Sequence, residues 1–343
     1  MIYCGYAPSQ PEAQLTNQEQ RRESAPPRCT EATRRLGEQS IGSAPIWTRC
    51  LVVELAPPWD QKVEFSKAFP APLRELLSQL DDEGDRVRLQ CVLPDPDYSA
   101  TGMARLMLFS RPEGAFVTND RVEYLVPDEL VASLAGSLLK DDDGLGEFAP
   151  FKEPDRRTRD IMVCTHGNRD ACCGSFGVPV YEELRAMAPE SPAKDWSQVR
   201  VWRTSHTGGH RFAPTLIDMP DGRYWAGVDA ELARAILGRR GDVATIADSY
   251  RGWAALETCA EQNAEKAAFA RVGWDWLDAE KRVETVGRTP GNDRHRVRFE
   301  YARQGDERTE SLEIAVEFTG TVPTMNCMKE GTKGDNPQYR VVV

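Results

Sequence analysis

The feature that most constrains the fold is an order of predicted elements that occurs twice along the chain. In the first half, strand-like apolar runs over 47–56 and 86–93 flank a helix whose leucines recur at helical spacing. A further strand and a hairpin follow over 104–127, and a second helix begins at Pro127 and Asp128. The first half therefore reads as a β-α-β unit followed by a hairpin and a helix.

The second half returns to this order without evident sequence repetition. Strands are predicted over 159–166 and 198–205, with a helix over 178–188 between them. A hairpin over 215–228 and a helix over 229–240 complete the unit. Because a helical crossover joins parallel strands, each half has the arrangement of a thioredoxin-like unit.

These two units predict an α/β fold in which one thioredoxin-like α/β domain precedes another, with mixed sheets and flanking helices. The alternative is one continuous mixed sheet that spans both halves. We place the domains at 43–145 and 146–343, the second with a helical extension over 249–277 and strands after it. Residues 1–42 are rich in Gln, Glu, Pro, Arg and Ser and are predicted to be disordered, with a short ordered strap as the alternative.

Composition restricts the function classes. The chain has 343 residues, 40% apolar content and a formal net charge of −11, which is typical of a globular protein and a poor match to nucleic acid as a partner. The first residues lack the apolar core of a signal peptide, and no apolar run approaches the roughly 18 residues that cross a bilayer. We therefore expect a cytoplasmic protein without a membrane partner, and nine cysteines in a reducing compartment indicate metal binding or catalysis.

Four candidate metal ligands stand after two parallel strands of the second half. Cys164 ends the first strand and Cys173 precedes the helix, whose positive N-terminus favours thiolates. His206 and His210 follow the second strand, and the two glycines between them let both rings point at one centre. Since the carboxyl ends of parallel strands face one crevice, these side chains should meet there. Pro214 stands where thioredoxin folds carry a cis-proline.

Two thiolates and two imidazoles suit either a structural zinc ion or a [2Fe–2S] cluster. The eight residues between Cys164 and Cys173 favour the cluster, because zinc sites commonly use shorter spacing, but they leave both open. Cys172 could replace its neighbour Cys173, although only one of the two should face the metal. His166 is expected to be a hydrogen-bond donor or solvated rather than a ligand, and Cys327 is not expected to reach the site.

Two long motifs resemble the sucrase/ferredoxin-like family. They are CTHGNRDACCG at 164–174 and VWRTSHTGGHRFAPTLIDMPDGRYWAG at 201–227, and the resemblance extends from about Cys29 to the C-terminus. It implies that 146–343 is a thioredoxin-like ferredoxin domain. The domain at 43–145 is expected to hold no cluster, because its Cys50 and Cys91 lack histidine partners.

The resemblance also implies a [2Fe–2S] cluster. Its two cysteine ligands, separated by eight residues, correspond to Cys164 and Cys173. Its two HxGGH histidines correspond to His206 and His210.

The expected function is one-electron transfer by an electron carrier rather than by a stand-alone enzyme. Imidazole in place of two thiolates should raise the potential and couple reduction to proton uptake, as in Rieske centres. A redox partner protein is implied, with a flavin-dependent reductase as one class, since the chain has no G-x-G-x-x-G motif after a strand. A zinc-stabilised Cys2His2 interaction module without redox activity and a metal-free scaffold are the alternatives.

Overall fold

The computed structural model describes residues 29–84, 87–140, 143–190, 196–289, 293–306, 308–325 and 332–342. Most of the segment predicted to be disordered, 1–28, lies outside these ranges, as does Cys327. None of the described helices combines the length and the apolar character that a bilayer crossing requires.

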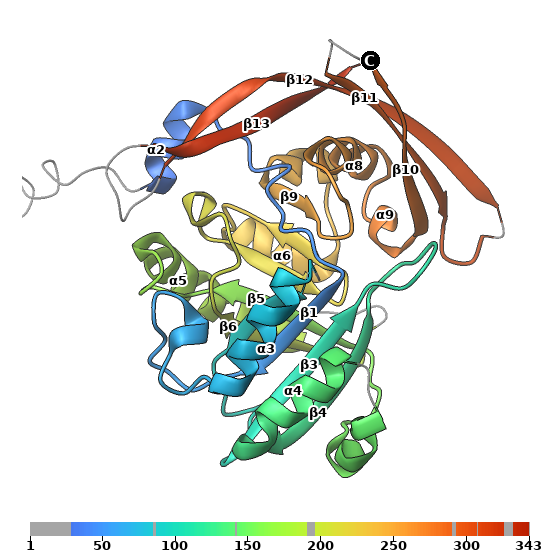
Figure 1. The fold of residues 1–343 in the computed structure, drawn as a ribbon. Coiled ribbons are helices and arrows are strands. Elements are labelled where there is room, and N and C mark those ends of the chain that lie inside the picture. The colour runs from blue at the N-terminus through green and yellow to red at the C-terminus, as the bar shows by residue number, and fades with distance from the viewer. Residues whose placement is uncertain are drawn as a thin grey trace, which may run out of the picture.

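A nine-stranded mixed sheet runs through both halves of the chain in the order β4-β3-β1-β2-β6-β5-β7-β8-β9 (Figure 1). Its strands are β1 (Arg49–Glu54), β2 (Val87–Val92), β3 (Met103–Ser110), β4 (Asp120–Pro127), β5 (Thr158–Cys164), β6 (Gln198–Thr204), β7 (Leu216–Met219), β8 (Arg223–Trp225) and β9 (Tyr250–Trp253). The α/β fold class is therefore confirmed.

Each half has the expected topology. β1 and β2 are parallel, as are β5 and β6, whereas β3 and β7 run antiparallel to the first strand of their half. The halves join where β2 meets β6 in antiparallel orientation at the pair Val92 and Thr204. The paired units and the continuous sheet, which we treated as alternatives, are thus both present, because the exposed edges of two units pair with each other. The boundary predicted between 145 and 146 falls within the 3-10 helix η3 (Asp143–Phe151).

Helices connect and cover the sheet. They are α2 (Cys29–Leu36), α3 (Ala71–Asp82), α4 (Val131–Lys140), α5 (Ala171–Met187), α6 (Ala230–Gly238), α7 (Val243–Ile246), α8 (Cys259–Val272) and α9 (Asp275–Asp278). Short 3-10 turns are η1 (Val63–Phe65), η2 (Asp128–Leu130), η4 (Ala188–Glu190), η5 (His210–Phe212) and η6 (Ala247–Ser249). α3 crosses from β1 to β2, and α5 crosses from β5 to β6, as the parallel pairs require.

Successive side chains of a strand point to opposite faces of the sheet and pack in separate apolar clusters. Leu51 and Val53 of β1 pack in the cluster of α3 and α4, whereas Val52 packs in a second cluster on the opposite face. That second cluster also contains Met107 from the first half and Trp202 from the second half, so apolar side chains of both halves meet in one layer. A third cluster covers the second half with α5, α6 and α8.

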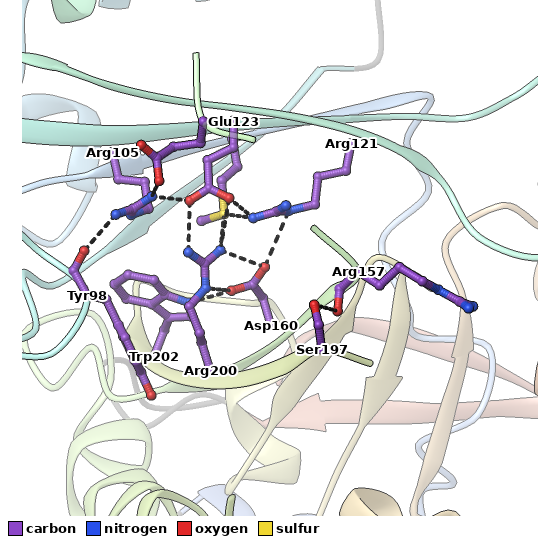
Figure 2. A network of polar contacts seen from close by, with 11 residues as sticks. Tyr98, Arg105, Arg121, Glu123, Arg157, Asp160, Ser197, Arg200 and Trp202 are labelled. Carbon is purple, nitrogen blue, oxygen red and sulfur yellow. Dashed lines mark hydrogen bonds and ion pairs between the residues drawn. The ribbon is translucent and has the colours of Figure 1, made fainter. Parts of the chain in front are cut away.

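A network of buried charges also joins the halves (Figure 2). Arg200 of β6 donates to Asp160 of β5 at 2.7 Å and to Glu123 of β4 at 2.8 Å. Arg105 and Arg121 of the first half also pair with Glu123. All five side chains are at most 10% exposed, so this contact between the halves is polar and closely paired.

The C-terminal strands form a separate antiparallel sheet in the order β10 (Glu280–Thr289), β11 (Arg294–Ala302), β12 (Thr309–Met325) and β13 (Thr332–Val342). The predicted antiparallel pair over 295–303 and 311–319 is confirmed as β11 and β12. In Figure 1 this sheet lies over α8, and β12 and β13 reach α2.

The described part of the N-terminal segment corrects one prediction. Residues 29–36 form α2, where we expected disorder, and the chain after α2 is tied to distant elements. Glu38 accepts from Arg211 Nε at 2.7 Å and from Asn336 at 2.9 Å, and Ser40 donates to the Asp248 carbonyl at 3.0 Å. Contacts with distant residues, rather than local propensity, hold this segment in place. For residues 29–42 the alternative of a short ordered strap is therefore a better description than disorder.

A candidate metal centre at the ends of two parallel strands

The carboxyl ends of β5 and β6 bring the two candidate loops together. Cys164, the last residue of β5, is the register partner of Thr204, the last residue of β6. The loop after each strand therefore starts at the same edge of the sheet. The expected neighbourhood of the two motifs is present.

Three of the four predicted ligands form one cluster. The candidate ligand atoms of Cys164, Cys173 and His206 all lie within 4.8 Å of one another. Cys173 Sγ is 3.8 Å from His206 Nδ1. Both cysteines are fully buried, whereas His206 is partly exposed. The arrangement offers two sulfurs from inside the protein and one imidazole from its surface.

His210 lies beside this cluster and contacts a second set of donors. Its Nδ1 is 2.9 Å from Asp170 Oδ2 and 3.3 Å from Cys29 Sγ. Its ring centroid is 5.8 Å from that of His206. Cys29 and Asp170 thus belong to the surroundings of the site, and we had not predicted Cys29 there. The one signal for Cys29 in the sequence was that the family resemblance begins near it.

The glycines of the HTGGH loop are needed for its conformation. Gly208 and Gly209 have φ values of 81° and 64°, in the left-handed region. A Cβ on Gly209 would also lie 2.6 Å from Nη2 of Arg251, whose Nη1 donates to the Gly208 carbonyl at 3.1 Å. This turn separates His206 from His210 and directs one ring toward each set of donors. The Ala213–Pro214 peptide is cis, as expected.

Helix α5 begins earlier than predicted. It starts at Ala171 rather than near residue 178, because the Asp170 side chain accepts a hydrogen bond from Cys172 N at 2.9 Å and caps the helix. Cys172 and Cys173 therefore lie in its first turn instead of in the preceding loop. The cysteines thus lie closer to the positive end of the helix than we expected.

The pKa values of the two cysteines of the first cluster are shifted in opposite directions. Hydrogen bonds from Cys173 and His206 hold the pKa of Cys164 well below its ordinary range, despite full burial. The pKa of Cys173 is raised, because it donates to Cys164 and is itself buried. The pair therefore favours a thiolate at Cys164 over one at Cys173, and binding of a metal ion would release the proton that remains on Cys173.

The structure also places the other candidates. Cys172 turns away from Cys164, and its Sγ lies 3.4 Å from Cys29 Sγ, so Cys173 is the neighbour of Cys164. His166 Nε2 is 2.8 Å from the Asp60 carbonyl, and burial lowers the pKa of this imidazole. Within the described ranges, Cys50 and Cys91 of the first half join no group of three metal-binding side chains.

Comparison with known proteins shows the family of the chain. Residues 40–252, more than half of the chain, match the sucrase/ferredoxin-like family. A relative from Meyerozyma guilliermondii, "Altered inheritance of mitochondria protein 32", is 27% identical over 109 residues, which are 30% of this chain and 37% of the relative. The match thus spans just over a third of that protein. No solved structure shows significant similarity to the chain. From the extent of the family match and the motifs within it, the chain belongs to the sucrase/ferredoxin-like family.

Proposed function

We propose that this protein transfers single electrons through a [2Fe–2S] cluster held by Cys164, Cys173, His206 and His210. The observation that carries the proposal is the convergence of two buried sulfurs and one imidazole within 4.8 Å, with His210 beside them. A mixed set of two thiolates and two imidazoles is the ligand set of a Rieske-type cluster.

The position of His210 favours a two-iron group over a single zinc ion. A tetrahedral zinc site holds all four donor atoms around one centre, at about 2.0–2.3 Å from the metal. Here three donors, from Cys164, Cys173 and His206, form one group. His210 belongs to the neighbouring group with Cys29 and Asp170. A larger inorganic core would span that separation, whereas one zinc ion would require His210 to move.

The residues around the donors suit a redox site. The capped N-terminus of α5 places partial positive charge beside Cys173, which stabilises negative charge there. Asp170 is placed to accept the Nδ1 proton of His210, and that leaves Nε2 as the donor atom of the ring. When bound, the cluster would supply one-electron storage at a potential above that of all-cysteine ferredoxins, with proton uptake on reduction.

Electron exchange would take place at the histidine side. The sulfurs are buried, whereas His206 is partly exposed and the His210 side chain is 17% exposed. An imidazole edge at the surface gives an electron a shorter route than the buried thiolates do. We infer a redox partner protein, with a flavin-dependent reductase as one class of donor, and we propose a cytoplasmic location.

The direct test is anaerobic purification followed by metal and sulfide analysis. The proposal predicts a red-brown protein with iron and acid-labile sulfide in equal amounts. The His206→Cys and His210→Cys variants should each lower the reduction potential, because a thiolate adds negative charge to the site. His295→Cys, at a histidine on β11, is the matched control and should leave the potential unchanged. A colourless protein with bound zinc would replace the proposal with the zinc-stabilised module.

A further inference from the structure

We propose that Cys29 and Cys172 are a site of reversible disulfide formation that ties helix α2 to helix α5. Their Sγ atoms are 3.4 Å apart, although 143 positions separate the residues in the sequence. A disulfide has an S–S length of about 2.05 Å, so an approach of a little more than about 1 Å would form the bond. Cys172 is the cysteine of the CC pair that the proposed cluster does not use.

The pair is built by the packing of α2. This helix contacts η5, and Cys29 at its first position meets Cys172 in the first turn of α5. The two residues form a small apolar cluster of their own with Ala213, and all three are at most 2% exposed. The packing therefore holds the two sulfurs in contact, beside His210 Nδ1, which is 3.3 Å from Cys29 Sγ.

Under the proposed function the cluster occupies Cys164 and Cys173, and the other described thiols, Cys50, Cys91 and Cys259, are less suited to reaction. Burial raises the pKa of Cys50 to about 12 and that of Cys91 as well. Since the thiolate is the attacking form, both should stay unreactive. Cys259 donates to the Gly42 carbonyl at 3.2 Å, and its pKa is raised by burial. With Cys164 and Cys173 held by the cluster, selective oxidation should occur at Cys29 and Cys172, whose Sγ atoms are 3.4 Å apart.

A small-molecule disulfide such as glutathione disulfide can supply the oxidation. The Cys29 thiolate attacks one of its sulfurs and releases one glutathione thiolate, and Cys172 then displaces the second. The two protein thiols lose two electrons and two protons, and one oxidant molecule becomes two thiols.

The test uses the full-length protein in glutathione disulfide, followed by alkylation and trypsin digestion without reduction. The expected product is peptide Cys29–Arg34 joined to peptide Asp170–Arg185, with fragmentation between Cys172 and Cys173 assigning the bond. Excess reduced glutathione should reverse it. A product with alkylated Cys29, or with Cys172 bonded to Cys173 or Cys164, would overturn the proposal.

Variants complete the test. Cys29→Ser and Cys172→Ser should each abolish the linked peptide, whereas Cys259→Ser should leave it unchanged. The same oxidation in denaturant should scatter the bonds over many cysteines, because only the folded chain selects the pair. If Cys172→Ser does not fold, Cys29→Ser and the wild-type digest decide the outcome. The selectivity rests on the proposed function, so iron and sulfide content is measured on the same sample: a bond to Cys164 in cluster-free protein counts against the cluster, and the same bond in cluster-containing protein counts against the Cys29–Cys172 pair.

Discussion

At Gly177, the absence of a side chain lets helix α5 pass directly over the end of β5. A Cβ built there would lie 1.9 Å from the carbonyl oxygen of Cys164, far inside contact distance. Gly177→Ala should therefore push the helix away from the cysteine pair. We expect a loss of about 1–3 kcal/mol in the free energy of unfolding, typical of overpacking, and a lower metal content. Urea unfolding and metal analysis measure both.

Gly136→Ala in α4 is the matched control for this change. A Cβ at Gly136 meets no atom within 4 Å, and the residue is also helical. Alanine there should stabilise the protein by about 0.4–1 kcal/mol, because it restricts the unfolded chain. Equal changes in the free energy of unfolding for the two variants would show that the close approach to Cys164 does not explain the need for glycine at position 177.

At the scale of the element, α5 depends on one carboxylate for two tasks. Asp170 caps the helix through Cys172 N and pairs with His210 Nδ1. Asp170→Ala should cost about 1 kcal/mol from the lost cap and should also release His210 from its orientation. We expect reduced stability together with a reduced metal content.

Asp229→Ala in α6 separates these two effects. Asp229 caps α6 by accepting from Leu232 N at 2.9 Å and joins neither of the two donor clusters. This variant should lose about the same stability through its cap and keep the metal content of the wild type. Should both variants lose metal alike, Asp170 would act through helix stability alone.

At the scale of the whole molecule, buried charge couples the two halves. Burial disfavours the charged form of Asp160, but Arg200 and Arg121 hold its pKa below the ordinary range. Removing one partner of a buried pair costs about 3–5 kcal/mol, so Arg200→Met should destabilise the protein by that order. Its matched control, Arg298→Met, breaks an exposed pair with Glu313 and should cost less than about 1 kcal/mol.

The same pairing predicts the acid response. Because the folded pKa of Asp160 is depressed, its stabilisation is present above the unfolded pKa of about 3.9 and is lost as the pH falls through the folded value. Arg200→Met raises the folded pKa, so its acid unfolding should begin at a higher pH than that of the wild type. An unchanged midpoint in a circular dichroism titration would contradict the role of Arg200.

The sequence predicted the elements better than their assembly. Strand and helix periodicity located β5, β6 and the hairpin of β7 and β8, because alternation and helical spacing are local properties. The start of α5 was missed by about two turns, since a cap depends on how the Asp170 side chain turns. The union of both halves in one sheet was only an alternative, because a single edge pairing leaves no local pattern.

The sequence by itself predicted the candidate site: two cysteines and two histidines, placed after parallel strands by local patterns and motif spacing. Only the tertiary structure decided which cysteine stands beside Cys164, and that His210 faces Asp170 and Cys29. Those choices depend on contacts between residues up to 181 positions apart. Such contacts arise from packing over the whole chain, and they cannot be predicted from local periodicity, which depends only on residues close in sequence.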